Sequence, residues 1–418
     1  MGRSACSRSV EWAFAPPPSV PRYDTVHMTS TGRNVALLAA CQAMLFSNSA
    51  TLASINGLAG MSLATNPALG TLPVTTWVLG GAIATLPASL YMKKAGRTQG
   101  LIAGASTGIV AALVCALAIG LHDFWLLCLG TLIFGASNAT GQYYRFAAAD
   151  VSPPDYKARA ISLVLAGGLL GGIIGPGTSR FLVDAFSDRF LGAYLVLIVF
   201  CVVSILLLKA TRIPDPTEEE KASGGRSLRE IARQPKFIVA VLSGAIGYGV
   251  MNLLMTATPI AMGLCGHPFG DAAFVVSSHV IAMFAPSLIA GSLIKRFGVF
   301  RIILVGAVLN VACIAIALSG TQVAHFWLSL VLLGVGWNFM YIGGTTLLTE
   351  TYRPEEKAKA QGTNDMCIFA MMVISSLTSG MLVTGAGWER VNLFAMPLLA
   401  VVFAATVWLA MRREPAAA

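Results

Sequence analysis

Residues 149–160 read ADVSPPDYKARA, and residues 349–360 read TETYRPEEKAKA. The two segments share the order acid, proline, acid, lysine and alanine at a constant separation of 200 residues. Two further pairs support the same division: SLYMKKAG at 89–96 precedes GSLIKRFG at 291–298, and Phe-Trp at 124–125 precedes Phe-Trp at 326–327, each by 202 residues. Self-similarity at a spacing of 200 to 202 residues indicates two related halves that repeat the same element order.

The residues around these segments are strongly apolar. Of the 418 residues, 56% are hydrophobic and 11% are charged, which is outside the range of soluble domains. A bilayer core needs roughly 20 apolar residues per helical span. Twelve such stretches predict an all-α membrane protein of twelve transmembrane helices in two six-helix bundles. They begin near Val35, Val74, Leu101, Phe124, Ala158, Phe190, Phe237, Ala272, Ile302, Phe326, Gly362 and Leu393.

The polar segments predict the domain boundaries. We expect a disordered tail at 1–33, a bundle at 34–208, a central loop at 209–236, a second bundle at 237–411 and a tail at 412–418. The first tail holds arginines and a run of prolines at 16–18 but no apolar signal region, so we expect no cleaved signal peptide. Because Met28 directly precedes the first apolar stretch, we hypothesise that translation starts there.

The basic residues set the expected orientation. With the N-terminus inside, nearly all loop lysines and arginines face the cytoplasm, including those of the central loop from Lys209 to Lys236. This asymmetry predicts a multi-pass protein of a bacterial inner membrane with both termini cytoplasmic. The net charge of +9 comes from these loops and not from one basic surface, so nucleic acid is not an expected partner.

The motifs of other function classes are missing from the sequence. The eight cysteines are scattered without a C-x-x-C pair, and no metal-ligand spacing occurs. There is no H-E-x-x-H cluster and no G-x-x-x-x-G-K-[ST] loop. We therefore expect no enzyme, no metal, no cofactor and no ATP-driven pump.

The loop after the second apolar stretch resembles a motif of the major facilitator superfamily, G-x-x-x-D-R-x-G-R. Lys94, Gly96 and Arg97 match it, while Ser89 replaces the first glycine and Lys93 the aspartate. In the second half Gly291, Arg296 and Gly298 match, and Lys295 replaces the acid. The resemblance covers residues 30–411 and implies a transporter that works by alternating access. It also implies that the first, fourth, seventh and tenth helices line the solute cavity.

Those four helices each carry a polar stripe at helical spacing. A buried amide in lipid needs water, a solute or another side chain as its partner. We therefore expect the stripes to line the cavity, with hydrogen bonding between helices as the alternative for any single residue. The candidate solute-binding residues are Gln42, Asn48, Asn56, Asn138, Gln142, Tyr143, Tyr248, Asn252, Trp337, Asn338 and Tyr341.

Ionisable residues within the apolar stretches are few, and such residues are candidates for proton coupling or gating. The candidates for this role are Asp365, His279 and Arg145, and Arg180 is the other base placed within a span. Two alternatives stay open. A position of Asp365 in the first turn of its helix would complement the helix dipole, and His279 would equally serve as a hydrogen bonder between helices.

A cavity of amides and aromatic rings with little fixed charge suits a largely neutral solute with a planar or apolar body. The strings GQYYRFAAAD at 141–150 and GYGVMNLLMTATPIAM at 247–262 are similar to a bacterial subgroup that includes riboflavin transporters. The resemblance implies riboflavin uptake by a monomer in membrane lipid, with protons as the candidate coupling ion. Gly171, Gly175 and Pro176 partly match a motif of proton-coupled antiporters, so drug or metabolite efflux is one alternative. A non-transporting membrane receptor is another.

Overall fold

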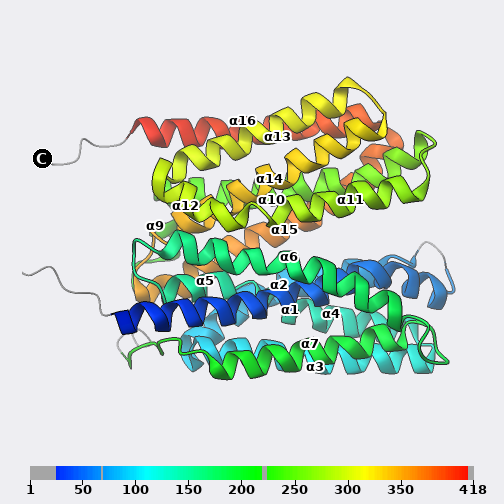
Figure 1. Ribbon diagram of the computed structural model, residues 1–418, viewed down its shortest axis with the longest axis horizontal. Coiled ribbons are helices and arrows are strands. Elements are labelled where there is room, and N and C mark those ends of the chain that lie inside the picture. The colour runs from blue at the N-terminus through cyan, green and yellow to red at the C-terminus, as the bar shows by residue number, and fades with distance from the viewer. Residues whose placement is uncertain (1–24, 67–68, 219–223, 413–418) are drawn as a thin grey trace, which may run out of the picture.

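The fold is described by a computed structural model that covers residues 25–66, 69–218 and 224–412, and every regular element in these ranges is a helix (Figure 1). Residues 1–24 and 413–418, which include Met1 and most of both expected tails, lie outside the described residues.

The first half of the chain forms seven helices. Their bounds are α1 (Thr25–Leu63), α2 (Leu72–Ala95), α3 (Arg97–Leu121), α4 (Phe124–Gly141), α5 (Tyr144–Asp150), α6 (Lys157–Leu182) and α7 (Leu191–Ala210). The helices α4 and α5 together make one span.

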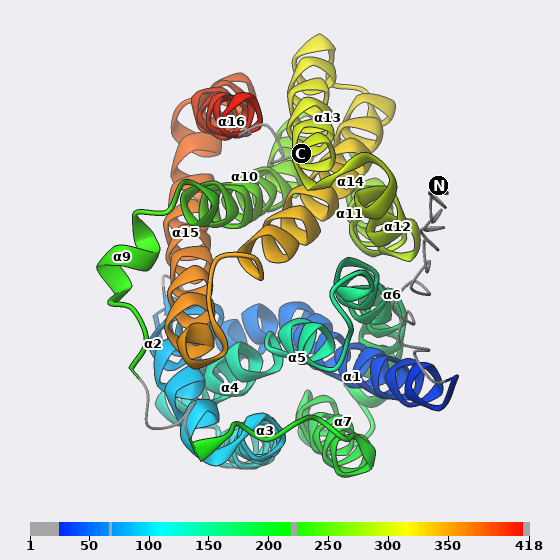
Figure 2. The same cartoon turned by 90° about the vertical axis from the view of Figure 1, so that its left-hand side faces the viewer.

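The second half repeats this order after a short connecting helix, α9 (Leu228–Ala232). Its helices are α10 (Pro235–Leu264), α11 (Phe269–Phe284), α12 (Ser287–Phe297), α13 (Val299–Ser319), α14 (Val323–Leu348), the 3₁₀ turn η2 (Pro354–Glu356), α15 (Lys357–Gly385) and α16 (Trp388–Met411). Figure 2 shows the two sets as separate bundles, α1–α7 on one side and α10–α16 on the other.

Eleven helical spans in the described residues are long and apolar enough to cross a membrane, and the bent pair α11 and α12 makes a twelfth. The predicted fold of twelve spans in two bundles is therefore confirmed. The eighth span differs from the single helix expected from Ala272, because it is bent by 42° between its two pieces. Pro286 lies at the break, where it cannot donate a backbone hydrogen bond and its ring crowds the preceding turn.

Asn338 of α14 lies beside this break. Its amide nitrogen donates to the Met283 carbonyl oxygen at 2.6 Å and to the Ser287 hydroxyl at 2.5 Å. These bonds give partners to polar groups at a point where the membrane offers none.

Several helices begin earlier than their apolar stretches. The helix α1 begins at Thr25, so the structure corrects the expected tail at 1–33 for residues 25–33, Met28 included. The eleventh span begins at Pro354 and not near Gly362. Extending an existing helix adds a hydrogen bond for each residue fixed, so helices continue into polar sequence beyond the membrane. At Pro354 the start is favoured because proline fits the first turn.

The bundles meet mainly along two pairs of spans: α2 packs against α15, and α6 packs against α11 and α12, the two pieces of the eighth span. The motif residues lie at these contacts. Ser89 of α2 donates to the Ala358 carbonyl oxygen at the start of α15, at 2.9 Å. In the other half a Cβ at Gly291 would lie 2.5 Å from the Cα of Arg159 and 2.6 Å from the Ala158 carbonyl oxygen. Glycine is therefore required where α12 touches the backbone of α6.

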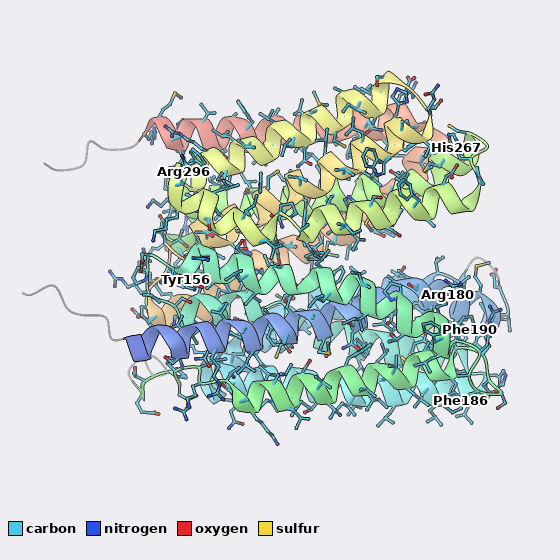
Figure 3. All side chains as sticks on the ribbon, viewed as in Figure 1. Tyr156, Arg180, Phe186, Phe190, His267 and Arg296 are labelled. Carbon is cyan, nitrogen blue, oxygen red and sulfur yellow. The ribbon has the colours of Figure 1, made fainter. Side chains whose placement is uncertain are left out.

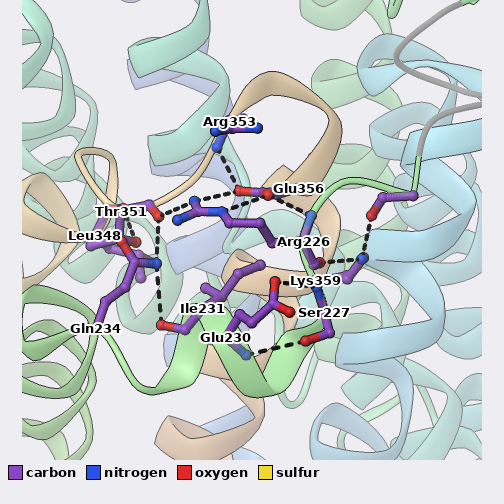
Figure 4. Close-up of polar contacts among 11 residues, drawn as sticks. Arg226, Ser227, Glu230, Ile231, Gln234, Leu348, Thr351, Arg353, Glu356 and Lys359 are labelled. Atoms are coloured by element: carbon purple, nitrogen blue, oxygen red, sulfur yellow. Dashed lines mark hydrogen bonds and ion pairs between the residues drawn. The ribbon is translucent and has the colours of Figure 1, made fainter.

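The later part of the central connection, residues 224–234, docks on the start of the eleventh span (Figure 4). The buried carboxylate of Glu356 accepts from the Arg226 side chain at 2.7 and 2.9 Å and from the Arg353 backbone at 2.9 Å. Lys359 donates to the Arg226 carbonyl oxygen at 2.8 Å. Hydrogen bonding to Glu356 raises the pKa of the Arg226 guanidinium above its usual value. Residues 224–234 are thereby fixed to the second bundle.

We call the end of the bundles that holds this connection the connection end. Figure 3 shows Tyr156 and Arg296 at that end, on its left, and Arg180, Phe190 and His267 at the opposite end.

Candidate functional site

A small cavity lies between the two bundles, with a volume of about 20 Å³. A space of this size holds about one water molecule. The side chains that line it come from α4, α5, α10, α14 and α15 and from the turn between α4 and α5. They are Asn138, Gln142, Arg145, Tyr248, Tyr341, Asp365, Ile368, Phe369 and Met372. Six of these nine residues are among the candidates expected from the sequence.

An ion pair crosses the cavity from one bundle to the other. Arg145 of α5 donates through a terminal guanidinium nitrogen to Asp365 Oδ1 of α15 at 2.5 Å, and the two side chains are 1% and 2% exposed. Asn364 donates to the same oxygen at 2.8 Å, and the other terminal nitrogen of Arg145 donates to the Gln142 carbonyl oxygen at 2.7 Å. A buried charge is tolerated only when it is paired in this way.

The pair retains unused hydrogen-bonding atoms. Among the described residues, neither Asp365 Oδ2 nor Arg145 Nε has a hydrogen-bond partner, although both are buried. An unpartnered acceptor and an unpartnered donor beside one cavity are costly in the empty protein. Both atoms belong to residues that line the cavity.

The position of Asp365 corrects one of the alternatives expected from the sequence. With α15 beginning at Lys357, Asp365 lies in its third turn and not in the first. The influence of a helix dipole on a side chain is confined to the first turn. The dipole therefore does not account for this carboxylate, whereas Arg145 does.

Aromatic rings form one wall of the site. Trp337 and Tyr341 of α14 stack with ring centroids 5.0 Å apart, and Tyr248 of α10 meets them edge-on at 5.3 and 5.5 Å. Phe284 packs edge-on against Trp337 at 5.8 Å. The Arg145 guanidinium lies 4.8 Å from the centre of the Tyr341 ring. The ion pair is thus in contact with the aromatic wall at Tyr341.

Two amides also line the cavity. Asn138 accepts a hydrogen bond from Ser49 of α1 at 3.1 Å, and Gln142 accepts one from the Tyr341 hydroxyl at 3.4 Å. The second contact joins the two bundles.

The candidates on α1 lie elsewhere. Asn48 donates to the Cys201 sulfur at 3.5 Å, and Asn56 accepts from the Tyr194 hydroxyl at 2.9 Å, so both face α7 within the first bundle. Gln42 is buried on α1 and is not among the residues that line the cavity.

The remaining candidates also bond between helices. Tyr143 donates to the Thr85 carbonyl oxygen at 3.1 Å, and Asn252 donates to Ser375 of α15 at 2.9 Å. His279 of α11 bonds to the Leu330 carbonyl oxygen of α14 at 2.7 Å. Trp337 does not line the cavity but supports Tyr341 from behind, and Asn338 serves the break in the eighth span.

Three lining residues were not expected from the sequence: Ile368, Phe369 and Met372 of α15. They follow Asp365 at intervals of three, four and seven residues, which places all four side chains on one helix face. That spacing from the buried acid was the available signal. It was missed because apolar residues in an apolar helix do not stand out.

The connection end is closed by a second polar cluster across the bundles. Arg97 of α3 pairs with Asp150 of α5 at 2.7 Å and donates to Gln361 of α15 at 3.0 Å. Lys357 of α15 pairs with the other oxygen of Asp150 at 3.1 Å. Ser162 of α6 also bonds to the second bundle, accepting from the Gly291 backbone at 3.0 Å. These contacts hold the bundles together between the cavity and the connection end.

Two six-helix bundles around a central polar cavity, closed at one end, define the class of an alternating-access membrane transporter. The chain belongs to the Major Facilitator Superfamily, whose family model matches residues 35–268 and 247–418. This confirms the resemblance expected from the loop motifs, and the chain is a multi-pass membrane transporter of that family.

Within the family, the chain is similar to several bacterial transporters. The chain is 40% identical to the riboflavin transporter RfnT of Brucella anthropi over 390 residues, which is 93% of this chain and 97% of that protein. It is 29% identical to YddS, an uncharacterised MFS-type transporter of Bacillus subtilis, over 81% of each chain. The predicted similarity to bacterial riboflavin transporters is therefore confirmed.

Solved structures agree with the fold. The Escherichia coli transporter FucP in its outward conformation superposes with a TM-score of 0.71 at 19% identity, covering 91% of this chain and 99% of that one. The human organic anion transporter MFSD10 superposes with a TM-score of 0.75 at 14% identity, covering 90% and 99%.

Proposed function

We propose that the protein takes up riboflavin across a bacterial inner membrane by alternating access. The observation that carries the proposal is the 40% identity to a riboflavin transporter along nearly the whole of both chains. The site supports it chemically. Tyr248 and Tyr341 offer aromatic contacts for a planar solute, and Asn138 and Gln142 offer amides for a hydroxylated chain.

In this proposal the two bundles, 34–208 and 237–411, rock about the cavity as units and the protein acts as a monomer. The connection end and both termini face the cytoplasm, an orientation supported by the basic loops. With the connection end closed, the described conformation would open to the outside.

Asp365 is the proposed proton carrier, and Arg145 is its gating partner. A proton on the carboxyl group would remove the charge that holds the Arg145 guanidinium at 2.5 Å. Since that contact joins the bundles, its loss would favour their movement. His279 is the weaker candidate, because its ring bonds to a backbone carbonyl away from the cavity.

Growth rescue tests the function. The protein is expressed in a bacterium that cannot make riboflavin, at riboflavin concentrations too low for the parent strain. We expect growth with the wild type and weaker growth with Asn138→Ala, which removes a lining amide. No rescue despite verified membrane expression would refute riboflavin uptake.

A protonophore tests the coupling. If Asp365 carries the proton, a protonophore lowers wild-type uptake to the level of Asp365→Asn. Unchanged uptake in Asp365→Asn would remove Asp365 as the carrier, while leaving riboflavin as the solute.

A further inference from the structure

The residues that line the cavity carry both unpartnered and partnered polar atoms. Asp365 Oδ2 is an acceptor without a partner, and Arg145 Nε is a donor without a partner. Both side chains line the same cavity and are at least nine-tenths buried, at 2% and 1% exposure. The side-chain amides of Asn138 and Gln142, which carry N–H donors, lie on the same lining. The residues around the cavity therefore supply one unpartnered acceptor, one unpartnered donor and two amides.

An imide is a ring edge that matches this set, because its N–H donor lies between two carbonyl acceptors. We propose that Asp365 and Arg145 recognise the imide edge of a planar heterocycle, with Asp365 Oδ2 accepting from the ring N–H and Arg145 donating to a flanking carbonyl. The proposal rests on the function proposed above, since the isoalloxazine ring of riboflavin carries such an edge.

The surroundings orient the ring. The Arg145 guanidinium lies over the Tyr341 ring, and Trp337 supports that ring from behind. A heterocycle whose edge reaches the ion pair would thus lie beside the aromatic wall, in contact with Tyr248 and Tyr341.

The ion pair lies between the two bundles, so a solute that binds there would affect how the bundles are held together. Arg145 belongs to the first bundle and Asp365 to the second, so a solute between them replaces a contact that holds the bundles together. The cavity of about 20 Å³ is too small for a heterocycle, so the bundles must separate when the solute enters. Oδ2 accepts an N–H whether the carboxyl group is charged or carries its proton on Oδ1, so this contact is compatible with proton coupling.

Binding of methylated riboflavin tests the proposal on the purified wild-type protein. Methylation at the imide nitrogen, N3, removes the donor and leaves the rest of the molecule intact. We expect N3-methylriboflavin to bind at least about tenfold more weakly than riboflavin, since it leaves the buried acceptor unpaired. Equal binding would overturn the imide contact while leaving riboflavin as the solute. No binding of riboflavin at all would instead overturn the proposed function.

Two variants separate hydrogen bonding from bulk. Asp365→Leu keeps a similar volume without an acceptor, so the preference for riboflavin over its N3-methyl form should disappear. Asp365→Asn keeps an acceptor oxygen, and the preference should persist. A preference of the same size in the leucine variant would mean that the methyl group clashes elsewhere, which overturns the assignment.

Competition by uridine tests whether the solute is a flavin or a smaller heterocycle. The pyrimidine of uridine carries the same imide edge without the wide ring system. We expect uridine to compete at least about tenfold more weakly than riboflavin, as it covers less of the aromatic wall. Competition as strong as that of riboflavin would support the imide contact but contradict a flavin as the solute.

Discussion

At the scale of single residues, the main feature of the central cavity is one buried ion pair. Arg145 and Asp365 lie 220 positions apart in the chain and are nearly fully buried. In a low-dielectric interior such a pair adds little net stability over apolar packing, whereas removing one partner is costly. We interpret the pair as a functional contact retained between moving bundles.

The cost of an unpaired Arg145 gives the first prediction. Asp365→Asn should lower the free energy of unfolding by about 3–5 kcal/mol, because the buried guanidinium loses its counter-charge. The double variant Arg145→Gln/Asp365→Asn should recover most of this loss. Thermal unfolding of the purified protein in detergent measures both.

A matched control is the exposed pair Arg189–Asp184, whose side chains are 67% and 70% exposed. Asp184→Asn should cost no more than about 1 kcal/mol. If the Arg145→Gln/Asp365→Asn variant is as unstable as Asp365→Asn alone, the unpaired buried charge is not the cause of the lost stability.

Residue types were predictable, but their partners were not. The polar stripes placed Asn138, Gln142, Tyr248 and Tyr341 at the cavity because amides and rings stand out in an apolar helix. The same pattern included Asn56, which instead bonds within one bundle. Helical spacing defines a face, and it does not define which neighbour that face meets.

At the scale of elements, the bundle contacts depend on small residues in the repeated loop motif. Ser89 and Gly291 occupy equivalent positions in the two halves, and each touches the start of a helix of the other bundle. Their partners are equivalent too, since Ala158 and Ala358 are 200 residues apart. The substitution of serine for glycine in the first motif thus adds a hydrogen bond without losing the close contact.

Gly291→Val is the test at this scale. The new Cβ would lie 2.5 Å from the backbone of Arg159, so α12 must move away from α6. We expect a loss of about 1–3 kcal/mol in stability and a matching drop in uptake. Gly120→Val is the control, because a Cβ there meets nothing within 4 Å. The explanation fails if both variants melt and transport alike.

At the same scale, the sequence predicted which helices exist more reliably than where each helix begins. All twelve spans were predictable from apolar length, but η2 and the start of α15 were not, because polar residues extend a helix once its membrane span exists. The division of the eighth span at Pro286 was also missed, although proline within a helix was a visible warning.

At the scale of the whole molecule, the polar contacts named between the bundles lie at the cavity or toward the connection end. Lys357 and Arg97 both reach Asp150 there, and Ser89 and Ser162 bond across the two helix pairs. The bundles are thus held together at this end, and the small cavity lined by Arg145 and Asp365 lies between them.

The orientation of this arrangement makes a direct prediction. Cys265 is exposed just after α10, at the end opposite the connection. A maleimide that cannot cross membranes should therefore label Cys265 in right-side-out vesicles, and Cys265→Ser should abolish that labelling. The other described cysteines are buried or partly buried. Labelling of Cys265 only after permeabilisation would reverse the proposed topology.

The repeat at 200 residues allowed the global architecture to be predicted, because two related halves in a membrane leave few arrangements. The conformation was not predictable. Which end is closed depends on contacts such as Arg97 with Gln361, between residues that no local pattern connects.

Uptake of labelled riboflavin is the measurement that tests the central claim most directly. Cells that express the protein should accumulate the label in a saturable manner that excess unlabelled riboflavin suppresses, and the Arg145→Gln/Asp365→Asn variant should lose this uptake at equal expression. Uptake no faster than in cells without the protein would contradict riboflavin as its solute.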